Sequence, residues 1–178
     1  VNTYVQAIAG TKTHVVDSRK TIPGLRLAQK YAVRVGGGAN HRVGLYDGIL
    51  IKENHIATAG GVTAALKDAY AIVAAPDVAA RPEAPFIQIE VERLDQLTEA
   101  LQAGAKMVLL DNMTHEQIAE AVRINRDQFN GQAVLEVSGN VSLDNIRSYA
   151  ELGVDRISSG SLTKHIRATD YSMRVNAV

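Results

Sequence analysis

Short apolar segments alternate with helix-like segments along most of this 178-residue chain. The apolar segments are nearly continuous and end in polar or charged residues, as expected of strands covered on both faces. The last four recur roughly every 21 to 26 residues, and all the spacings leave room for a crossover helix. The alternation predicts a parallel sheet with right-handed crossovers. The predicted strands are residues 13–17, 48–52, 86–91, 107–111, 133–137 and 154–158.

The number of strands limits the choice of fold. About six parallel strands are fewer than the eight of a complete (β/α)₈ barrel. We therefore expect an α/β fold that is an open or incomplete (β/α) barrel, with a doubly wound sheet as the alternative. The length suits one domain over residues 1–178, without an internal linker.

Helices are expected between the strands. Pro23 suits the first turn of a helix whose apolar face has helical spacing. A second helix is expected over residues 62–75, ended by Pro76, and residues 75–85 are predicted to form a loop because they contain three prolines. The apolar face of the first of these helices consists of Leu25, Ala28, Ala32 and Val35.

A further helix is predicted at the start of the chain. Val1, Tyr4, Val5 and Ile8 share one helical face, and Gly10 is placed to end the helix. Because this helix begins at the first residue and the chain has no initiator Met, we expect a preceding segment to be missing.

Composition excludes several classes of function. The chain has no cysteine, which excludes disulfides and thiolate chemistry. It contains no apolar run near the roughly 18 residues of a membrane span and no signal-peptide pattern, so we expect a cytoplasmic protein that does not bind membranes. Residues 1–56 hold eight Lys and Arg against three Asp and Glu, but aromatic residues make up only 4%. A small anionic ligand is therefore expected rather than a nucleic acid.

Polar side chains mark the carboxyl end of every predicted strand, where parallel βα folds bind their ligands. Arginine and lysine bind carboxylates and phosphates, while paired carboxylates beside phosphates are typical of Mg²⁺ sites. The strand ends therefore predict a site for a multiply anionic small molecule. Cations follow the first two strands and carboxylates follow the next three: Arg19, Lys20 and Lys52, then Glu90, Asp111 and Glu136.

Small residues and a glycine run extend this site. His41 and Arg42 follow three glycines at 36–38, which allow the backbone to turn toward the same pocket. Ser138, Gly139 and Gly160 let backbone N–H groups approach a phosphate. A single Arg–Glu pair on such a rim would more often be structural. The functional interpretation depends on the convergence of all the strand ends, and Glu136 could equally organise its neighbours.

Several motifs together resemble the quinolinate phosphoribosyltransferases. The three most specific are DSRKTIPGLR at 17–26, GGGANHRVGLYD at 36–47 and IKENH at 51–55. Shorter motifs follow in the family's order, and the resemblance covers essentially the whole chain. They are EVE at 90–92, LDN at 110–112, EVSG at 136–139 and SLTKH at 161–165.

The resemblance implies a reaction and a Mg²⁺ cofactor. Quinolinate and phosphoribosyl pyrophosphate would give nicotinate mononucleotide, pyrophosphate and CO₂, a step of NAD biosynthesis. It implies that Lys20, Lys52, Glu90 and Asp111 are catalytic and that Glu90 and Asp111 hold the metal. The implied quinolinate site is Arg19, His41, Arg42 and Lys52. The implied ribose, phosphate and metal side is Lys20, Glu90, Asp111, Ser138, Gly139, Gly160 and Lys164, the last being His in some relatives.

The chain departs from the family at its start. Members carry an N-terminal α/β domain that, in the family's dimer, closes the neighbouring pocket and lends it an arginine. We therefore expect a homodimer or higher homo-oligomer, and weak or no turnover by this chain alone.

Two alternatives stay open. One is a nicotinate-type phosphoribosyltransferase, against which the excess of cations argues, because nicotinate has one carboxylate. The other is a non-catalytic ligand-binding or metal-transport accessory protein, against which intact Lys20, Lys52, Glu90 and Asp111 argue.

Overall fold

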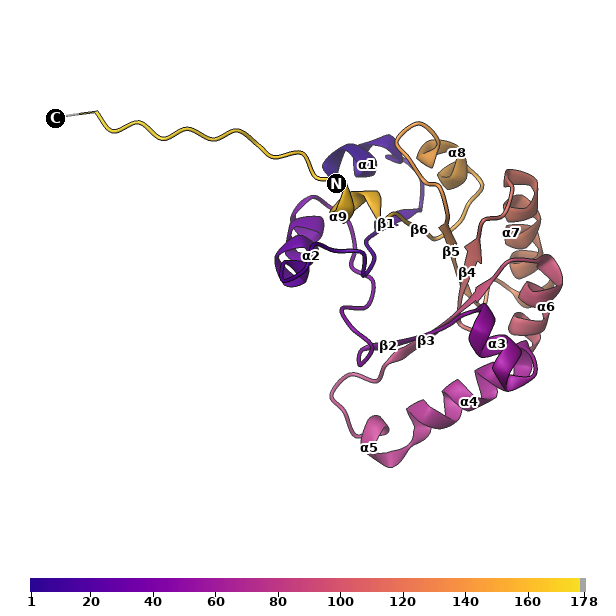
Figure 1. Cartoon of the computed structure of the whole chain (residues 1–178). Coiled ribbons are helices and arrows are strands. Elements are labelled where there is room, and N and C mark those ends of the chain that lie inside the picture. The colour runs from indigo at the N-terminus through magenta and orange to yellow at the C-terminus, as the bar shows by residue number, and fades with distance from the viewer. Residues whose placement is uncertain (177–178) are drawn as a thin grey trace.

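The computed structural model describes residues 1–176 and contains one curved sheet of parallel strands (Figure 1). The strand order is β1-β6-β5-β4-β3-β2, so β1 and β2 are the two edges. This order runs in one direction, whereas a doubly wound sheet reverses its order partway. The predicted open α/β barrel is therefore confirmed. The strands are β1 (His14–Val16), β2 (Gly48–Ile51), β3 (Phe86–Val91), β4 (Met107–Asp111), β5 (Val134–Ser138) and β6 (Arg156–Ser158).

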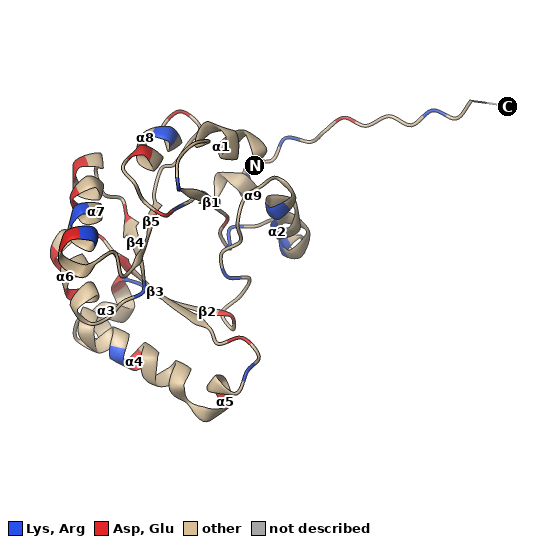
Figure 2. Cartoon of the chain, turned by 180° about the vertical axis from the view of Figure 1, so that it is seen from behind, with Lys and Arg blue, Asp and Glu red and all other residues tan. Residues whose placement is uncertain are grey.

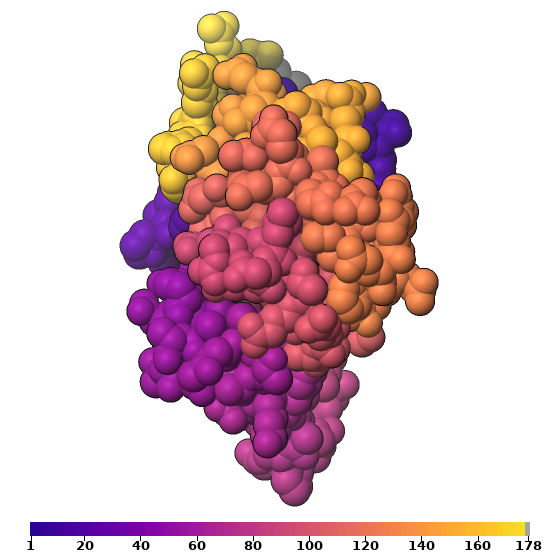
Figure 3. Space-filling view, turned by 90° about the vertical axis from the view of Figure 1, so that its right-hand side faces the viewer, coloured from indigo at the N-terminus to yellow at the C-terminus, as the bar shows by residue number. Residues whose placement is uncertain are grey.

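Helices cover the outer side of the sheet (Figure 1), and their apolar faces form the core with it. Figure 3 shows the surface of the molecule from this outer side. Leu66, Leu97 and Ile118 pack there against strand residues such as Leu110. Charges of both signs lie on the outer helices (Figure 2). The helices are α1 (Asn2–Ala7), α2 (Arg26–Val35), α3 (Glu53–Ala59), α4 (Val62–Ala74), α5 (Pro76–Ala79), α6 (Leu94–Gln102), α7 (His115–Phe129), α8 (Ile146–Glu151) and α9 (Ser161–Lys164).

Residues at the two ends of α7 show how the local sequence determines where the helix begins and ends. Thr114 caps α7 by accepting a hydrogen bond from the Gln117 backbone, and the Gln117 side chain accepts one in return from the Thr114 backbone. Asn130 ends the helix in the left-handed conformation. The chain then enters β5, which pairs with β4 over its whole length from Met107↔Val134 to Asp111↔Ser138.

The prediction for α2 was wrong in two respects. Pro23 precedes the helix, which begins at Arg26. The predicted core face is exposed at Leu25, Ala28, Ala32 and Val35, whereas the buried side chains of the helix are Gln29, Lys30 and Val33.

Polar partners decide which face of α2 is buried. Lys30 Nζ lies 2.6 Å from Asp17 Oδ1, and Gln29 Nε2 donates to the Thr163 carbonyl at 2.8 Å. Both partners lie outside the helix, so its own periodicity contains no sign of them.

Two short helices were not predicted. α3 directly follows β2, and α5 lies within residues 75–85, which were expected to be a loop. Pro76 stands at the first position of α5, where its missing N–H costs nothing, so it begins a helix as well as following α4.

Residues 166–176 form neither helix nor strand and extend away from the sheet (Figure 1). Within residues 1–176, no helix is both long and apolar enough to cross a membrane.

Candidate active site

Two adjoining cavities lie where the strands end at their carboxyl side. The first, called here the arginine cavity, has a volume of about 200 Å³ and contains Arg19, Lys20, His41, Arg42, Lys52, Glu90 and Glu136 in its wall. The second, called the glycine cavity, has a volume of about 510 Å³ and is lined by Lys20, Asp111, Ser138, Gly139, Gly160 and Lys164. Lys20 and Ser138 line both. All the predicted site residues thus line one cavity or the other, while their roles stay predictions.

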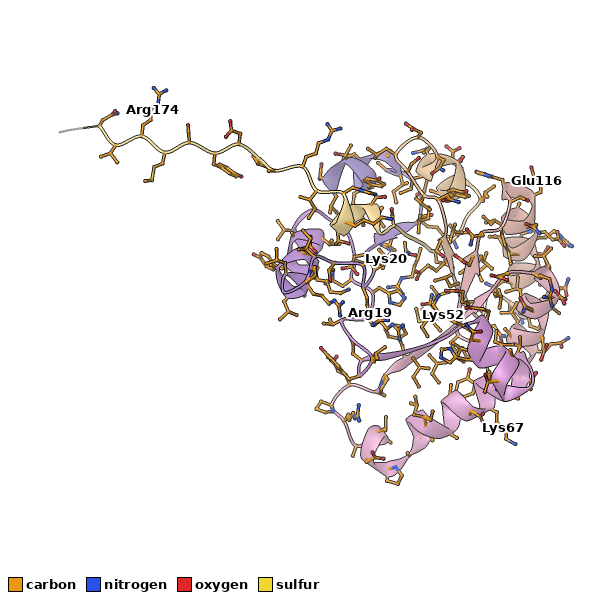
Figure 4. All side chains as sticks on the ribbon, viewed as in Figure 1. Arg19, Lys20, Lys52, Lys67, Glu116 and Arg174 are labelled. Carbon is orange, nitrogen blue, oxygen red and sulfur yellow. The ribbon has the colours of Figure 1, made fainter. Side chains whose placement is uncertain are left out.

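The curvature of the sheet brings the cations together. Arg19 and Lys20 follow β1, and Lys52 follows β2 at the opposite edge of the sheet. Their side chains lie on the concave side of the sheet, whereas Lys67 and Glu116 lie on the outer helices (Figure 4).

A buried ion pair fixes the loop that carries His41. Asp17 is fully buried and accepts hydrogen bonds from Lys30 Nζ at 2.6 Å, Asn40 Nδ2 at 2.7 Å and the His41 backbone N–H at 2.8 Å. The adjacent Ala39 forms a parallel bridge to Val16. A buried carboxylate needs such partners, since an unpaired charge there would cost several kcal/mol. Lys30 and Asn40 were not among the site residues predicted from the sequence.

Among the described residues, Arg19 and Arg42 of the arginine cavity form no ion pair with a carboxylate. Arg42 is buried, and its Nη1 donates to the Gly48 carbonyl at 2.9 Å. Burial lowers the pKa of Arg42, the charge of Arg19 lowers it further, and the charge of Asp47 opposes part of this fall. Two guanidinium groups that repel each other in a cavity are suited to bind an anion between them.

Lys52 and Glu90 form an ion pair at the edge of the same cavity. Lys52 Nζ donates to both carboxylate oxygens of Glu90, each at 2.9 Å. Burial raises the pKa of Glu90, and the hydrogen bond and charge of Lys52 oppose this rise. The nearby charge of Asp111 raises the pKa as well, which places the two predicted metal ligands in the same electrostatic environment.

A buried polar chain lies along the wall of the arginine cavity. His41 Nε2 lies 2.6 Å from Gln88 Oε1, and Gln88 Nε2 donates to Glu136 Oε2 at 3.1 Å. The sequence analysis did not select Gln88. Its position offered a signal, because residues two apart on a strand share a face and Gln88 therefore points the same way as Glu90.

The backbone around the glycine cavity requires unusual conformations. Gly139 has a φ of +96°, and a Cβ there would lie 3.2 Å from the Asn112 backbone nitrogen and closer still to Asn112 Oδ1. Asn112 and Asn140 are also left-handed, with φ of 53° and 49°. Successive backbone N–H groups in a turn such as that at Gly139 and Asn140 can form a concavity that suits phosphate oxygens, whereas the Asn112 N–H donates to the Ser138 carbonyl. At the far wall, a Cβ on Gly160 would come within 3.1 Å of Lys20 Cδ.

The carboxylates fit Mg²⁺ only in part. Asp111 accepts hydrogen bonds from Ser138 Oγ and Asn112 Nδ2, which leave further lone pairs on its oxygens. Residues 1–176 contain no group of three or more His, Cys, Asp or Glu that could hold a metal ion. Mg²⁺ commonly takes one or two carboxylates and completes its shell with water and substrate phosphates. Glu90 and Asp111 fit that mode and do not form a complete protein cage.

Known proteins resemble the chain over nearly all of its length. The family model for the C-terminal domain of quinolinate phosphoribosyl transferase matches residues 1–174. The nicotinate-nucleotide pyrophosphorylase (carboxylating) of Mycobacterium leprae is 45% identical over 170 residues, which are 96% of this chain and 56% of that protein. The human protein of the same name is 38% identical over 172 residues, or 95% of this chain and 54% of that one. The chain thus spans about half the length of these relatives.

Solved structures agree with the sequence matches. NadC from Streptococcus pyogenes superposes with a TM-score of 0.86 at 41% identity, covering 98% of this chain and 57% of that one. The nicotinate-nucleotide pyrophosphorylase of Francisella tularensis has a TM-score of 0.82 at 48% identity, covering 93% and 55%. The chain belongs to the quinolinate phosphoribosyltransferase family and corresponds to its C-terminal domain.

Proposed function

We propose that the protein transfers phosphoribosyl from phosphoribosyl pyrophosphate to quinolinate with loss of CO₂, giving nicotinate mononucleotide and pyrophosphate for NAD biosynthesis. The observation that carries this proposal is the pair Arg19 and Arg42, which line one cavity without an anionic partner among the described residues. The names of the relatives in Mycobacterium leprae and human support the same reaction.

The arginine cavity is the proposed quinolinate site. Quinolinate has two adjacent carboxylates, and two arginines with Lys52 supply more positive charge than one carboxylate needs. Nicotinate has a single carboxylate and would leave part of this charge unpaired. His41, which the resemblance also assigns to the quinolinate site, lies in the wall of the cavity with both ring nitrogens hydrogen-bonded to protein groups.

The glycine cavity is the proposed site for the phosphoribosyl group. Its larger volume, the left-handed backbone at Gly139 and the cations Lys20 and Lys164 support phosphate binding. Mg²⁺ would be held by Asp111 and Glu90 together with substrate phosphates, and when bound it would neutralise charge on the departing pyrophosphate.

Electrostatic positioning is the proposed basis of catalysis. Ribosyl transfer develops positive charge on the sugar, which the carboxylates of Glu90 and Asp111 stabilise. After transfer the ring nitrogen is cationic and accepts the electron pair released when the adjacent carboxylate leaves as CO₂. The ring carbon that has lost the carboxylate then takes up a proton, which water supplies, so the step needs no side chain as acid or base.

Three further properties stay predictions. The resemblance supports a homodimer or higher homo-oligomer, and the composition supports a cytoplasmic protein with small-molecule rather than nucleic-acid partners. The chain spans about half of the length of these relatives, so their activity, substrates and partners are assigned to it here only as a proposal.

Calorimetry with quinolinate and nicotinate tests the proposed site. Quinolinate is expected to bind more tightly than nicotinate, and its advantage should shrink from low to moderate salt because part of it is electrostatic. The titrations should use this chain and a form extended to the length of its relatives. A preference for nicotinate, or no quinolinate binding by the extended form, would refute the proposal.

A further inference from the structure

A continuous chain of hydrogen bonds connects Arg42 to the interior of the sheet. The Arg42 backbone N–H donates to His41 Nδ1 at 2.8 Å, His41 Nε2 meets Gln88 Oε1 at 2.6 Å, and Gln88 Nε2 donates to Glu136 Oε2 at 3.1 Å. Gln88 and Glu136 are both 0% exposed, so water does not replace these partners. This series of hydrogen bonds joins the neighbouring residues His41 and Arg42 to strands β3 and β5.

The hydrogen bonds determine the tautomer of His41. Because a backbone N–H can only donate, Nδ1 of His41 must accept and carries no hydrogen. The ring hydrogen is then on Nε2, which donates to Gln88 Oε1. Both ring nitrogens are occupied by protein groups, so His41 connects Arg42 to Gln88 and keeps no ring nitrogen for a ligand in this arrangement.

Glu136 determines the orientation of the Gln88 amide. A carboxylate oxygen accepts hydrogen bonds, so Gln88 must present its NH₂ group to Glu136 and its oxygen to His41. The reversed amide would place two acceptors together at one end and two donors at the other. The other oxygen of this carboxylate, Oε1, has no hydrogen-bond partner among the described residues although it is buried. His41 Nε2 lies 3.9 Å from Oε1, and Arg156 Nη1 lies 3.9 Å from Oε2.

We propose that Gln88 is a positioning residue for quinolinate binding. It acts through His41, whose ring holds the backbone of Arg42, and so fixes where the Arg42 guanidinium enters the arginine cavity. This role rests on the proposed function, since it assigns Arg42 to a substrate carboxylate. Among the described residues, the side chains of His41, Gln88 and Glu136 form no hydrogen bond with Lys20 or Lys164, so Gln88 is expected to affect quinolinate binding more than phosphoribosyl pyrophosphate binding.

Three variants separate positioning from general stability. Gln88→Met has a similar size and cannot hydrogen-bond to His41 or Glu136. Gln88→Glu can restore the pattern, because a carboxylic acid that shares a proton with Glu136 presents one acceptor and one donor. Asn125→Leu is the matched control: Asn125 is a buried amide hydrogen-bonded to Ala133, far from both cavities.

Two measurements on each variant test the role: calorimetric Kd values for quinolinate and phosphoribosyl pyrophosphate, and hydrogen exchange of the Arg42 amide by mass spectrometry. Gln88→Met is expected to weaken quinolinate binding roughly tenfold, to leave phosphoribosyl pyrophosphate binding within about twofold, and to speed exchange at Arg42. Gln88→Glu should stay close to wild type in both measurements. Asn125→Leu should lose stability without either change.

The opposite results are equally clear. Unchanged quinolinate binding by a folded Gln88→Met variant, equal losses in Gln88→Met and Asn125→Leu, or failure of Gln88→Glu to restore binding would each overturn the positioning role. Failure of the wild-type protein to bind quinolinate would instead count against the proposed function. Accelerated exchange of the Arg42 amide in Gln88→Met would in that case still support the structural link, because that measurement needs no ligand.

Discussion

At the scale of single residues, Arg42 is the most direct test of the arginine cavity. Arg42→Ala removes a charge-assisted contact worth roughly 1.5–3 kcal/mol, so quinolinate binding should weaken about 10- to 150-fold. Phosphoribosyl pyrophosphate binding should change much less. Calorimetry measures both, with Arg34→Ala on the exposed side of α2 as the control. Equal losses for the two ligands would mean that Arg42 is assigned to the wrong cavity.

Glu90 gives a prediction about pH. Burial raises its pKa above the ordinary value of 4.5, and Lys52 opposes the rise. The folded state therefore holds the proton more tightly than the unfolded state. The resulting contribution to stability is present below pH 4.5 and is lost as the pH rises through the folded pKa. The free energy of unfolding of wild type should thus fall relative to that of Glu90→Gln as the pH rises above 4.5, as measured by urea unfolding.

Replacing Lys52 tests whether its ammonium group opposes the rise in the pKa of Glu90. Lys52→Met removes the ammonium group that opposes the shift, so the pKa of Glu90 should rise further in a carbon-13 NMR titration. Lys67→Met on the outer surface of α4 should leave it unchanged. A fall in the pKa of Glu90 in Lys52→Met would contradict the ion pair.

At the scale of elements, the turn after β5 depends on a single glycine. Gly139→Ala forces a side chain into the left-handed region and against Asn112. Gly104 has a similar φ of +84° and open space around it, so Gly104→Ala shows the cost of the backbone alone, about 1–2 kcal/mol. Overpacking should add at least ~1 kcal/mol in Gly139→Ala and weaken phosphoribosyl pyrophosphate binding. If Gly139→Ala and Gly104→Ala lose the same free energy of unfolding in urea, the contact with Asn112 does not contribute to the cost.

Some elements could be predicted from the sequence and others could not. β3 and β4 have the predicted bounds because their apolar runs end abruptly at charged residues. The parallel topology then brought the strand ends together, which is why the predicted site residues line adjoining cavities. The buried face of α2 depends on Asp17 and Thr163, and Gln88 depends on a histidine 47 residues away. Such pairs depend on tertiary structure, and periodicity along one chain does not encode them.

At the scale of the whole molecule, the open barrel explains how the cations meet. β1 and β2 are the two edges of the sheet, and in a flat sheet their ends would be far apart. The curl of the sheet places Arg19 and Lys20 near Lys52 on the concave side (Figure 4). The carboxylates come from the central strands β3, β4 and β5. The cations therefore come from the two edges of the sheet and the carboxylates from its centre, and the curvature of the whole sheet brings both groups to one site.

The most direct test of the central claim is turnover by the protein at the length of its relatives. Quinolinate labelled in its 2-carboxylate is supplied with phosphoribosyl pyrophosphate and Mg²⁺, and nicotinate mononucleotide and labelled CO₂ are measured together. The two products are expected in equal amounts, and nicotinate is not expected to replace quinolinate. Product formed from nicotinate without CO₂, or no product from quinolinate, would contradict the proposed reaction.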